Sequence, residues 1–178
     1  MRSDTFAVLC CGLLMSNLCI SADKTVYGLH EHARLTDIDL DVRAKLDTGA
    51  AIASLSARNI KYFTRNGEQW VSFSPAIQGS PARIIEKPLV RVDQIKRRAD
   101  DRALNDQNLY TDRPVIILSV CMGDVLRTIE VNLTDRSDFE YPFLIGANAL
   151  RRFDALVDPS LKYKAGKPGC ASVAQNAE

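Results

Sequence analysis

The triplet Asp47-Thr48-Gly49 places a carboxylate, a hydroxyl and a glycine between two apolar segments of the sequence. A carboxylate in apolar surroundings costs free energy unless it is hydrogen-bonded, paired or functional. Two carboxylates about 3 Å apart cannot both ionise, and such a pair can activate water for attack on a peptide carbonyl. Asp47 is therefore the candidate catalytic residue. In this interpretation the Thr48 hydroxyl fixes the loop, and Gly49 donates its N–H to the carboxylate.

A second candidate segment is the apolar run Leu144-Ile145-Gly146. The run predicts a buried strand that passes beside the Asp47 loop and leads into a short helix. On its own it is typical of any buried strand. Because it accompanies Asp47-Thr48-Gly49-Ala50 in the same small β protein, we count Ala50 and the three residues of the run as support for the active site.

Asp135, Arg136, Ser137 and Asp138 form another polar cluster. Arg136 could hold a substrate carboxylate in a bidentate pair. Alternatively, Asp135 and Ser137 organise a turn while Arg136 pairs with a neighbouring carboxylate. The sequence leaves both roles open.

Metal and nucleotide sites are not predicted. Zinc needs three or four histidine, cysteine or carboxylate ligands at workable spacing. His30 and His32 are the two histidines; they share one face of a predicted strand, and we expect them at the surface beside Glu31. The sequence has neither H-E-x-x-H nor a P-loop, so we expect no cofactor. A formal net charge of +1 at pH 7 gives no indication of a nucleic-acid partner.

The 178 residues are enough for one domain. Residues 1–22 combine a weakly basic start, an apolar run and a final small residue, which predicts a cleaved signal peptide and a periplasmic or secreted protein. A single anchoring helix is the alternative, but the apolar run is shorter than the ~20 residues that span a bilayer. We expect the domain over residues 23–165 and a polar tail over residues 166–178.

Cys121 and Cys170 remain after removal of the predicted signal peptide. An exported protein with two cysteines could form one disulfide. However, Cys121 lies in an apolar predicted strand, whereas Cys170 lies in a polar segment with glycine and proline. This difference favours two unpaired cysteines, with the disulfide as the alternative.

Short strand patterns with turn signals about every ten residues predict a mainly β sandwich or barrel. The expected strands cover residues 24–35, 38–46, 51–57, 65–73, 83–92, 113–122, 125–133, 141–146 and 154–158, with turns at 66–67 and 123–124. Pro88 indicates an edge strand. Residues 93–113 are highly charged and predict an exposed helix or a loop, with a solvated connector favoured.

The segments AKLDTGA, GEQWVSF, RPVI, LTDRSDFEYPFLIGANAL and LVDPS follow one another between about Tyr27 and Tyr163. In these segments the chain resembles a RimK-associated family of bacterial retropepsin-like aspartic proteases, first labelled ATP-dependent zinc proteases. The resemblance implies a pepsin-like closed β-barrel with one short C-terminal helix and one catalytic aspartate per chain, here Asp47. It also implies gene neighbourhoods with ATP-grasp peptide ligases and association with a transglutaminase-like membrane protein.

The sequence departs from this family at two places. Ala147 stands where an arginine usually follows the glycine, and residues 93–113 lack the glycine turn of a flap. Both departures concern substrate recognition more than the fold. Residues 84–113 are nevertheless the segment that we expect to cover the cleft.

One Asp47 per chain implies that a catalytic pair requires a homodimer with the two carboxylates at a two-fold axis. The leading hypothesis is an exported retropepsin-like aspartic endopeptidase that acts as a homodimer on a peptide or protein substrate. The alternative is a non-catalytic, monomeric module that binds a peptide or a cell-envelope component. A third interpretation is a structural partner of the transglutaminase-like membrane protein.

Overall fold

The computed structural model describes residues 24–81, 83–96 and 109–170. In these residues the chain is mainly β, with one short α-helix and one 3-10 helix. The elements are β1 (Thr25–Leu35), η1 (Thr36–Ile38), β2 (Leu40–Asp47), β3 (Ala53–Arg65), β4 (Glu68–Pro75), β5 (Ile85–Pro88), β6 (Arg91–Lys96), β7 (Tyr110–Met122), β8 (Val125–Thr134), β9 (Phe143–Gly146), α1 (Ala147–Arg152) and β10 (Ala155–Lys162).

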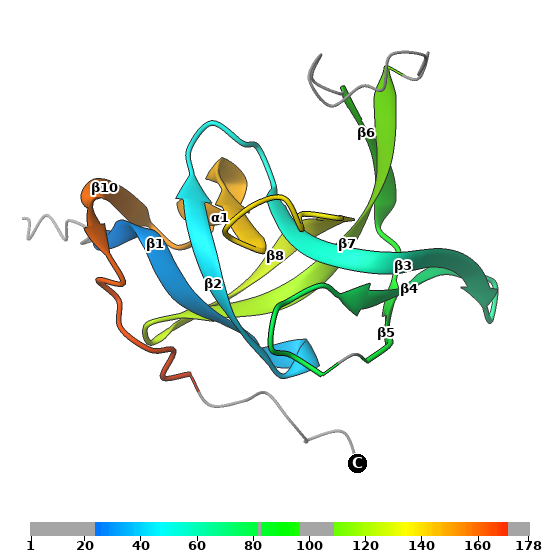
Figure 1. Cartoon of the computed structure of the whole chain (residues 1–178), viewed down its shortest axis with the longest axis horizontal. Coiled ribbons are helices and arrows are strands. Elements are labelled where there is room, and N and C mark those ends of the chain that lie inside the picture. The colour runs from blue at the N-terminus through cyan, green and yellow to red at the C-terminus, as the bar shows by residue number, and fades with distance from the viewer. Residues whose placement is uncertain (1–23, 82, 97–108, 171–178) are drawn as a thin grey trace, which may run out of the picture.

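Six of the strands form a closed barrel. They pair in the order β1-β2-β9-β3-β8-β7, and β7 pairs back onto β1 through Leu35 and Val120. β10 is added beside β1 and β6 beside β7, while β4 and β5 extend the long strand β3. Figure 1 shows the β3–β4 hairpin reaching away from the barrel on the right, with the β6–β7 hairpin rising above it. The predicted closed β-barrel with one short C-terminal helix is confirmed.

The barrel interior is filled by the alternating apolar residues of its strands. In β2 the buried positions are Leu40, Val42, Ala44 and Leu46. Because side chains alternate along a strand, Asp41 and Arg43 face outward. Phe143 and Leu55, from the neighbouring strands β9 and β3, are fully buried and belong to the same core. The apolar pattern of the sequence thus sets which face of β2 is available for polar chemistry.

Two predicted turns are present. Asn66 and Gly67 both have positive φ, 52° and 82°, which is the backbone that a two-residue turn between β3 and β4 requires. Gly123 also has positive φ, and the turn that contains it joins β7 to β8. Residue pairs rich in asparagine, aspartate and glycine therefore located these hairpins correctly.

The predicted single strand over residues 83–92 is wrong, because the structure has two short strands there. The Leu89 N–H donates to the Gln69 carbonyl of β4, but the next N–H, of Val90, donates to the Val115 carbonyl of β7. The chain changes partner between these two residues, which separate β5 from β6. β5 pairs only with β4, so the edge position indicated by Pro88 is confirmed.

The charged segment 93–113 begins and ends as strand rather than as helix or loop. Asp93 pairs with Arg113 and Lys96 with Tyr110, so that both ends continue the β6–β7 hairpin. Residues 97–108 lie outside the described residues. The predictions of a helix or a connector therefore fail at both ends of the segment.

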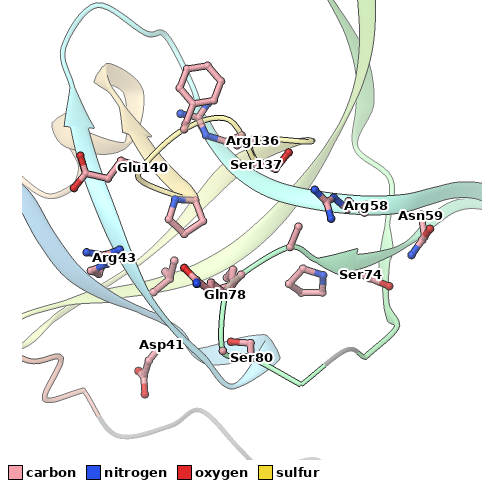
Figure 2. Close-up of a pocket in the computed structure, with 17 residues that line it drawn as sticks. Asp41, Arg43, Arg58, Asn59, Ser74, Gln78, Ser80, Arg136, Ser137 and Glu140 are labelled. Atoms are coloured by element: carbon pink, nitrogen blue, oxygen red, sulfur yellow. The ribbon is translucent and has the colours of Figure 1, made fainter.

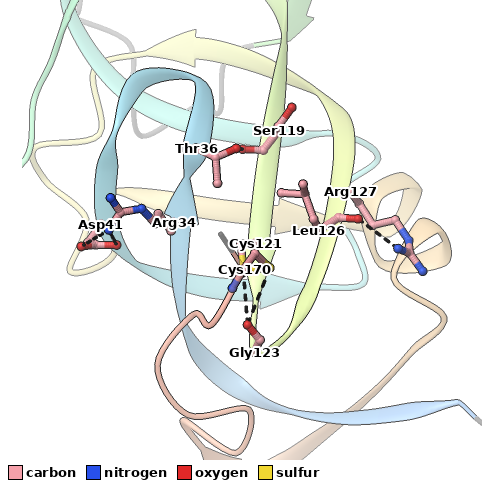
Figure 3. Close-up of a disulfide and its surroundings, with 9 residues drawn as sticks. All are labelled: Arg34, Thr36, Asp41, Ser119, Cys121, Gly123, Leu126, Arg127 and Cys170. Atoms are coloured by element: carbon pink, nitrogen blue, oxygen red, sulfur yellow. Dashed lines mark hydrogen bonds and ion pairs between the residues drawn. A yellow bond between two sulfur atoms is a disulfide. The ribbon is translucent and has the colours of Figure 1, made fainter. Parts of the chain in front are cut away.

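The structure corrects the expectation of two unpaired cysteines. Cys121 and Cys170 form a disulfide, with an S–S distance of 2.00 Å and a Cα–Cα distance of 6.0 Å (Figure 3). The sequence signal was misleading because the segment after β10 folds back onto the barrel. The Tyr163 N–H donates to the His30 carbonyl, and the Gly169 N–H donates to the Gly123 carbonyl beside the β7–β8 turn.

A buried carboxylate anchors the same segment. Glu31 is fully buried on β1, and its Oε1 accepts hydrogen bonds from Gly28 N at 2.6 Å and from Lys164 N at 3.0 Å. Its Oε2 accepts one from Ala165 N at 3.1 Å. Three backbone N–H groups therefore satisfy a charge that would otherwise be costly to bury.

The two histidines share one face, as strand alternation predicts, but they are half-buried rather than free at the surface. His30 stacks on Tyr141 with ring centroids 4.2 Å apart, and His32 stacks on Tyr163 at 4.4 Å. Burial lowers the pKa of His30, and the nearby charge of Lys162 lowers it further. These rings connect β1 to the segments that follow β8 and β10.

The predicted signal peptide, residues 1–22, and the last residues of the predicted tail, 171–178, lie outside the described residues. Within the described part of the chain, no helix is both long and apolar enough to cross a membrane.

We predict that Glu31→Ala lowers the free energy of unfolding by at least about 3 kcal/mol, because three backbone N–H groups lose the buried carboxylate that accepts their hydrogen bonds. Urea unfolding of the oxidised protein measures the change. The matched control is Glu68→Ala at an exposed position, with an expected change within about 0.5 kcal/mol. Equal effects at the two positions would contradict the anchoring role of Glu31.

Candidate active site

Asp47 is the last residue of β2 and is half-buried. β9 runs parallel to β2 beside it, with Lys45 opposite Leu144, Leu46 opposite Ile145 and Asp47 opposite Gly146. On its other side β9 pairs antiparallel with the start of β3. The apolar run therefore passes between the two strands that flank the Asp47 loop, as the sequence predicts.

The first residues of α1 hold the loop between β2 and β3 in place. The N–H groups of Ala147 and Asn148 donate to the carbonyls of Ala50 and Ala51, at 2.8 and 2.9 Å. These contacts satisfy two N–H groups that have no partner within the helix. A Cβ atom added at Gly146 would lie 2.6 Å from the Ile52 carbonyl oxygen, so only glycine fits without displacing the loop. Ala50 and Gly146 thus support the loop through backbone contacts.

The Asp47 carboxylate is oriented by its own loop. Oδ1 accepts hydrogen bonds from Gly49 N at 2.9 Å and Ala50 N at 3.3 Å. The predicted N–H donation from Gly49 is present. The predicted lock by Thr48 is not formed within one chain: Thr48 is exposed at the loop tip, and its hydroxyl makes no hydrogen bond with the described residues.

Part of the polar cluster after β8 forms a turn. Asp135 Oδ1 accepts a hydrogen bond from Ser137 N, and Asp135 Oδ2 accepts one from Arg58 Nε of β3, both at 2.9 Å. These contacts, led by the backbone bond from Ser137, lower the pKa of Asp135. Asp138 is exposed and makes no hydrogen bond or ion pair within the described chain. The turn alternative is therefore correct for Asp135 and Ser137.

Arg136 does not pair with a carboxylate, contrary to the second half of that alternative. Its side chain is buried, and none of the described carboxylates lies within ion-pair distance. Its backbone N–H donates to the buried Ser56 hydroxyl at 3.1 Å, and its guanidinium lies 4.5 Å from the centre of the Phe139 ring. Burial lowers the pKa of Arg136, the charge of Arg113 lowers it further, and the charge of Asp47 raises it. Arg136 and Asp47 therefore share one electrostatic environment.

A pocket of about 790 Å³ lies beside Arg136, between the outward face of β2, the start of β3 and the segment after β4. We call it the arginine pocket. Its polar lining comprises Asp41, Arg43, Arg58, Asn59, Ser74, Gln78, Ser80, Arg136, Ser137 and Glu140. Figure 2 shows Arg136 at the upper end, close to the strand that descends from the Asp47 loop, with Arg43 and Arg58 on opposite sides. Three of these side chains are cations.

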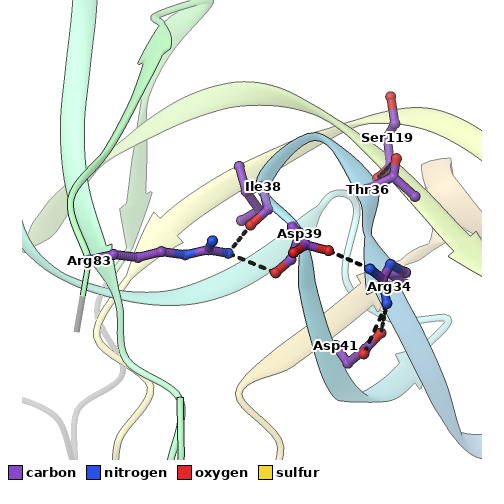
Figure 4. A network of polar contacts seen from close by, with 7 residues as sticks. All are labelled: Arg34, Thr36, Ile38, Asp39, Asp41, Arg83 and Ser119. Carbon is purple, nitrogen blue, oxygen red and sulfur yellow. Dashed lines mark hydrogen bonds and ion pairs between the residues drawn. The ribbon is translucent and has the colours of Figure 1, made fainter. Parts of the chain in front are cut away.

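Polar contacts fix one wall of this pocket. Arg34 forms ion pairs with Asp39 and with Asp41, the latter at 3.2 Å. Arg83, which follows the wall segment, donates to the carbonyls of Ile38 and Asp39 (Figure 4). The chain after β4 is thereby attached to the β1–β2 connection, and the Asp41 carboxylate is already engaged by Arg34.

The described residues contain no group of three histidine, cysteine or acidic side chains placed to hold a metal ion. Sequence reasoning missed Arg43 and Arg58 as neighbours of Arg136. Arg43 could have been found from the sequence, because the predicted alternation along β2 places it on the outward face of that strand. Arg58 contacts Asp135, which lies 77 positions away in the sequence, so no local sequence pattern indicates this contact.

The comparisons with known proteins agree with this geometry. The model of the RimB-like family, described as "Retropepsin-like aspartic endopeptidase RimB", matches residues 26–168. The crystal structure of the protein Lpg0085 from Legionella pneumophila subsp. pneumophila str. Philadelphia 1, described there as having unknown function (DUF785), is similar at a TM-score of 0.66 and 35% identity. The similarity covers 80% of this chain and 99% of that one.

Curated relatives carry another name. A "Probable alpha-L-glutamate ligase" from Shewanella pealeana is 30% identical over 158 residues, which cover 88% of this chain and 33% of that protein. A protein of the same name from Desulfotalea psychrophila is 29% identical over 149 residues, covering 81% of this chain and 30% of the relative. The chain spans about a third of the length of these curated relatives.

We predict that Gly146→Ala displaces the Asp47 loop, because the new Cβ overlaps the Ile52 carbonyl. The free energy of unfolding should fall by about 1–3 kcal/mol. Hydrogen exchange at the Ala147 and Asn148 amides should accelerate as their bonds to the loop weaken. Gly49→Ala is the control, since its Cβ would meet only the Asp47 carboxylate oxygen, at 3.3 Å. Unchanged exchange in Gly146→Ala would show that the strand does not hold the loop.

Proposed function

The chain belongs to the RimB-like family of retropepsin-like aspartic endopeptidases, and we propose that it hydrolyses peptide bonds with a pair of Asp47 carboxylates contributed by two copies of the chain. The observation that carries this proposal is the hydrogen-bonded Asp47 at the end of β2, on a loop supported by β9 and α1.

The geometry of a single chain supports a homodimer. One chain provides one such aspartate, whereas acid–base chemistry of this kind needs two carboxylates that share a proton. Thr48 and Gly49 are exposed at the loop tip, so a second copy can approach the loop. The Thr48 hydroxyl, which has no partner among the described residues of its own chain, is available to that copy. A two-fold axis at the loop tip would bring identical residues together.

In the proposed reaction, the ionised Asp47 takes a proton from water as its oxygen attacks the scissile carbonyl carbon. The protonated Asp47 of the second chain hydrogen-bonds to the carbonyl oxygen and stabilises its developing charge. The tetrahedral intermediate then collapses: its C–N bond breaks, and the Asp47 that took the water proton gives it to the leaving amine. The backbone N–H groups of Gly49 and Ala50 keep the Asp47 carboxylate oriented throughout.

The proposed substrates are acidic peptides, with α-linked glutamate as the first candidate. Three arginines line the pocket beside the loop. The matched relatives are named as glutamate ligases, and this chain corresponds to about a third of their length. A hydrolase that acts on peptides containing glutamate would be consistent with both observations.

The proposal includes export. The predicted signal peptide supports it, and so does the Cys121–Cys170 disulfide, since disulfides persist mainly in oxidising compartments. The alternative function, a monomeric module that binds an acidic peptide without cleaving it, is favoured by the arginine pocket and does not need a second chain.

We predict that the full chain cleaves peptides from a glutamate-containing library between about pH 4 and pH 7. Asp47→Asn should lower the rate by at least about 10²-fold, because the amide cannot act as general base. Mass spectrometry of the peptides measures cleavage, and circular dichroism checks that the fold is retained.

The matched control is Asp154→Asn at the start of β10. Asp154 has a left-handed backbone, with φ 49°, which asparagine also adopts readily, and it is exposed, with no side-chain hydrogen bond or ion pair to the described residues. This variant should cleave like the parent. Cleavage that survives in Asp47→Asn would reject the aspartic mechanism, and absence of cleavage in all three proteins would favour the binding module.

A further inference from the structure

Arg136 is a buried cation without an anionic partner. The residue is 8% exposed, and its buried Nε makes no hydrogen bond with the described residues. Burying an unpaired charge costs several kcal/mol, so folded proteins normally provide a counter-charge. Glu31 in the same chain shows the usual solution, with its carboxylate satisfied by three N–H groups. Among the described residues, no comparable acceptor serves the Arg136 side chain.

Two other charges at the arginine pocket are already paired, and Glu140, which also lines it, forms no ion pair with Arg136. Arg58 is paired with Asp135 at 2.9 Å, and the Asp41 carboxylate is paired with Arg34. Arg43 lies over the Tyr141 ring, 5.6 Å from its centre. Arg136 is thus the buried arginine at this pocket whose charge no described carboxylate neutralises.

The backbone of Arg136 is fixed even though its charge is not compensated. Its N–H donates to the Ser56 hydroxyl, and its carbonyl accepts a hydrogen bond from the Phe139 N–H at 2.9 Å. The Phe139 ring lies against the guanidinium and limits its motion. A guanidinium held in this way presents a planar fork that matches a carboxylate in two parallel hydrogen bonds.

We propose that Arg136 binds a carboxylate of the substrate in the arginine pocket and thereby selects an acidic residue close to the scissile bond. This inference rests on the proposed function and assigns a specificity residue to it. The Arg136 N–H is bound to Ser56 of β3, the strand that begins directly after the Asp47 loop. A carboxylate bound to Arg136 would therefore lie near the reacting peptide, and Figure 2 shows the pocket continuing away from that point toward Arg43 and Arg58.

The test measures binding separately from cleavage, by using Asp47→Asn as the parent. Fluorescence anisotropy at about pH 7 gives the affinity for a labelled glutamate peptide with a C-terminal amide. Arg136→Met, added to the parent, should weaken binding at least about tenfold. Arg136→Lys should retain part of the affinity, because it keeps the charge but loses the fork. The control is Arg65→Met on the β3–β4 hairpin, where the arginine pairs with Glu86 away from the pocket.

Stability distinguishes a ligand-binding role from a structural one. Because Arg136 has no counter-charge, Arg136→Met should melt at the same temperature as the parent or higher. Two further peptides identify the source of the carboxylate. A glutamine peptide with a C-terminal amide should bind at least about tenfold more weakly if side chains are recognised. A neutral peptide with a free C terminus should bind in an Arg136-dependent manner if the terminal carboxylate is recognised.

Equal binding of the parent and Arg136→Met would overturn the proposal, and so would a lower melting temperature in both Arg136 variants. Failure of the proposed function gives a different result. If the wild-type chain cleaves no peptide while binding still depends on Arg136, the carboxylate site stands and the endopeptidase assignment falls. If cleavage proceeds without any dependence on Arg136, the endopeptidase assignment stands and the carboxylate site falls.

Discussion

The passage of β9 between β2 and β3 is the constraint on which the rest of the site depends. Gly146 lies opposite Asp47 in a parallel ladder, and its missing side chain makes room for the Ile52 carbonyl. The following N–H groups then bind the loop carbonyls. A flexible turn would leave the carboxylate free to rotate. Here the backbone contacts with β9 and α1 and the hydrogen bonds to the Asp47 carboxylate fix the loop, so its tip can remain exposed without losing its geometry.

Two buried charges illustrate how the fold separates stability from recognition. Glu31 is surrounded by N–H donors that attach the segment after β10, next to the disulfide that closes it. Arg136 is also buried, but it has a fixed backbone and no described counter-ion. The first charge stabilises the folded chain. The second costs stability, and in our proposal a bound carboxylate compensates that cost.

Most of the fold could be predicted from the sequence, because apolar alternation and turn pairs such as Asn66-Gly67 are local signals. The position of the apolar run beside Asp47 also followed, through the family resemblance. The break between β5 and β6 did not, since Leu89 and Val90 donate to strands that lie far away in the sequence. The disulfide was missed for the same reason. Likewise, the arginine pocket joins β2, β3 and the segment after β8, which no local pattern could show.

The central claim is that two Asp47 carboxylates from two chains form one catalytic centre. The most direct measurement is the specific activity of the full chain on a glutamate peptide as a function of protein concentration, with sedimentation velocity on the same samples. If the dimer is the active species, activity per chain rises in parallel with the dimer fraction and vanishes as the protein dissociates. Constant activity per chain in samples that sediment as monomer would contradict a catalytic centre shared by two chains.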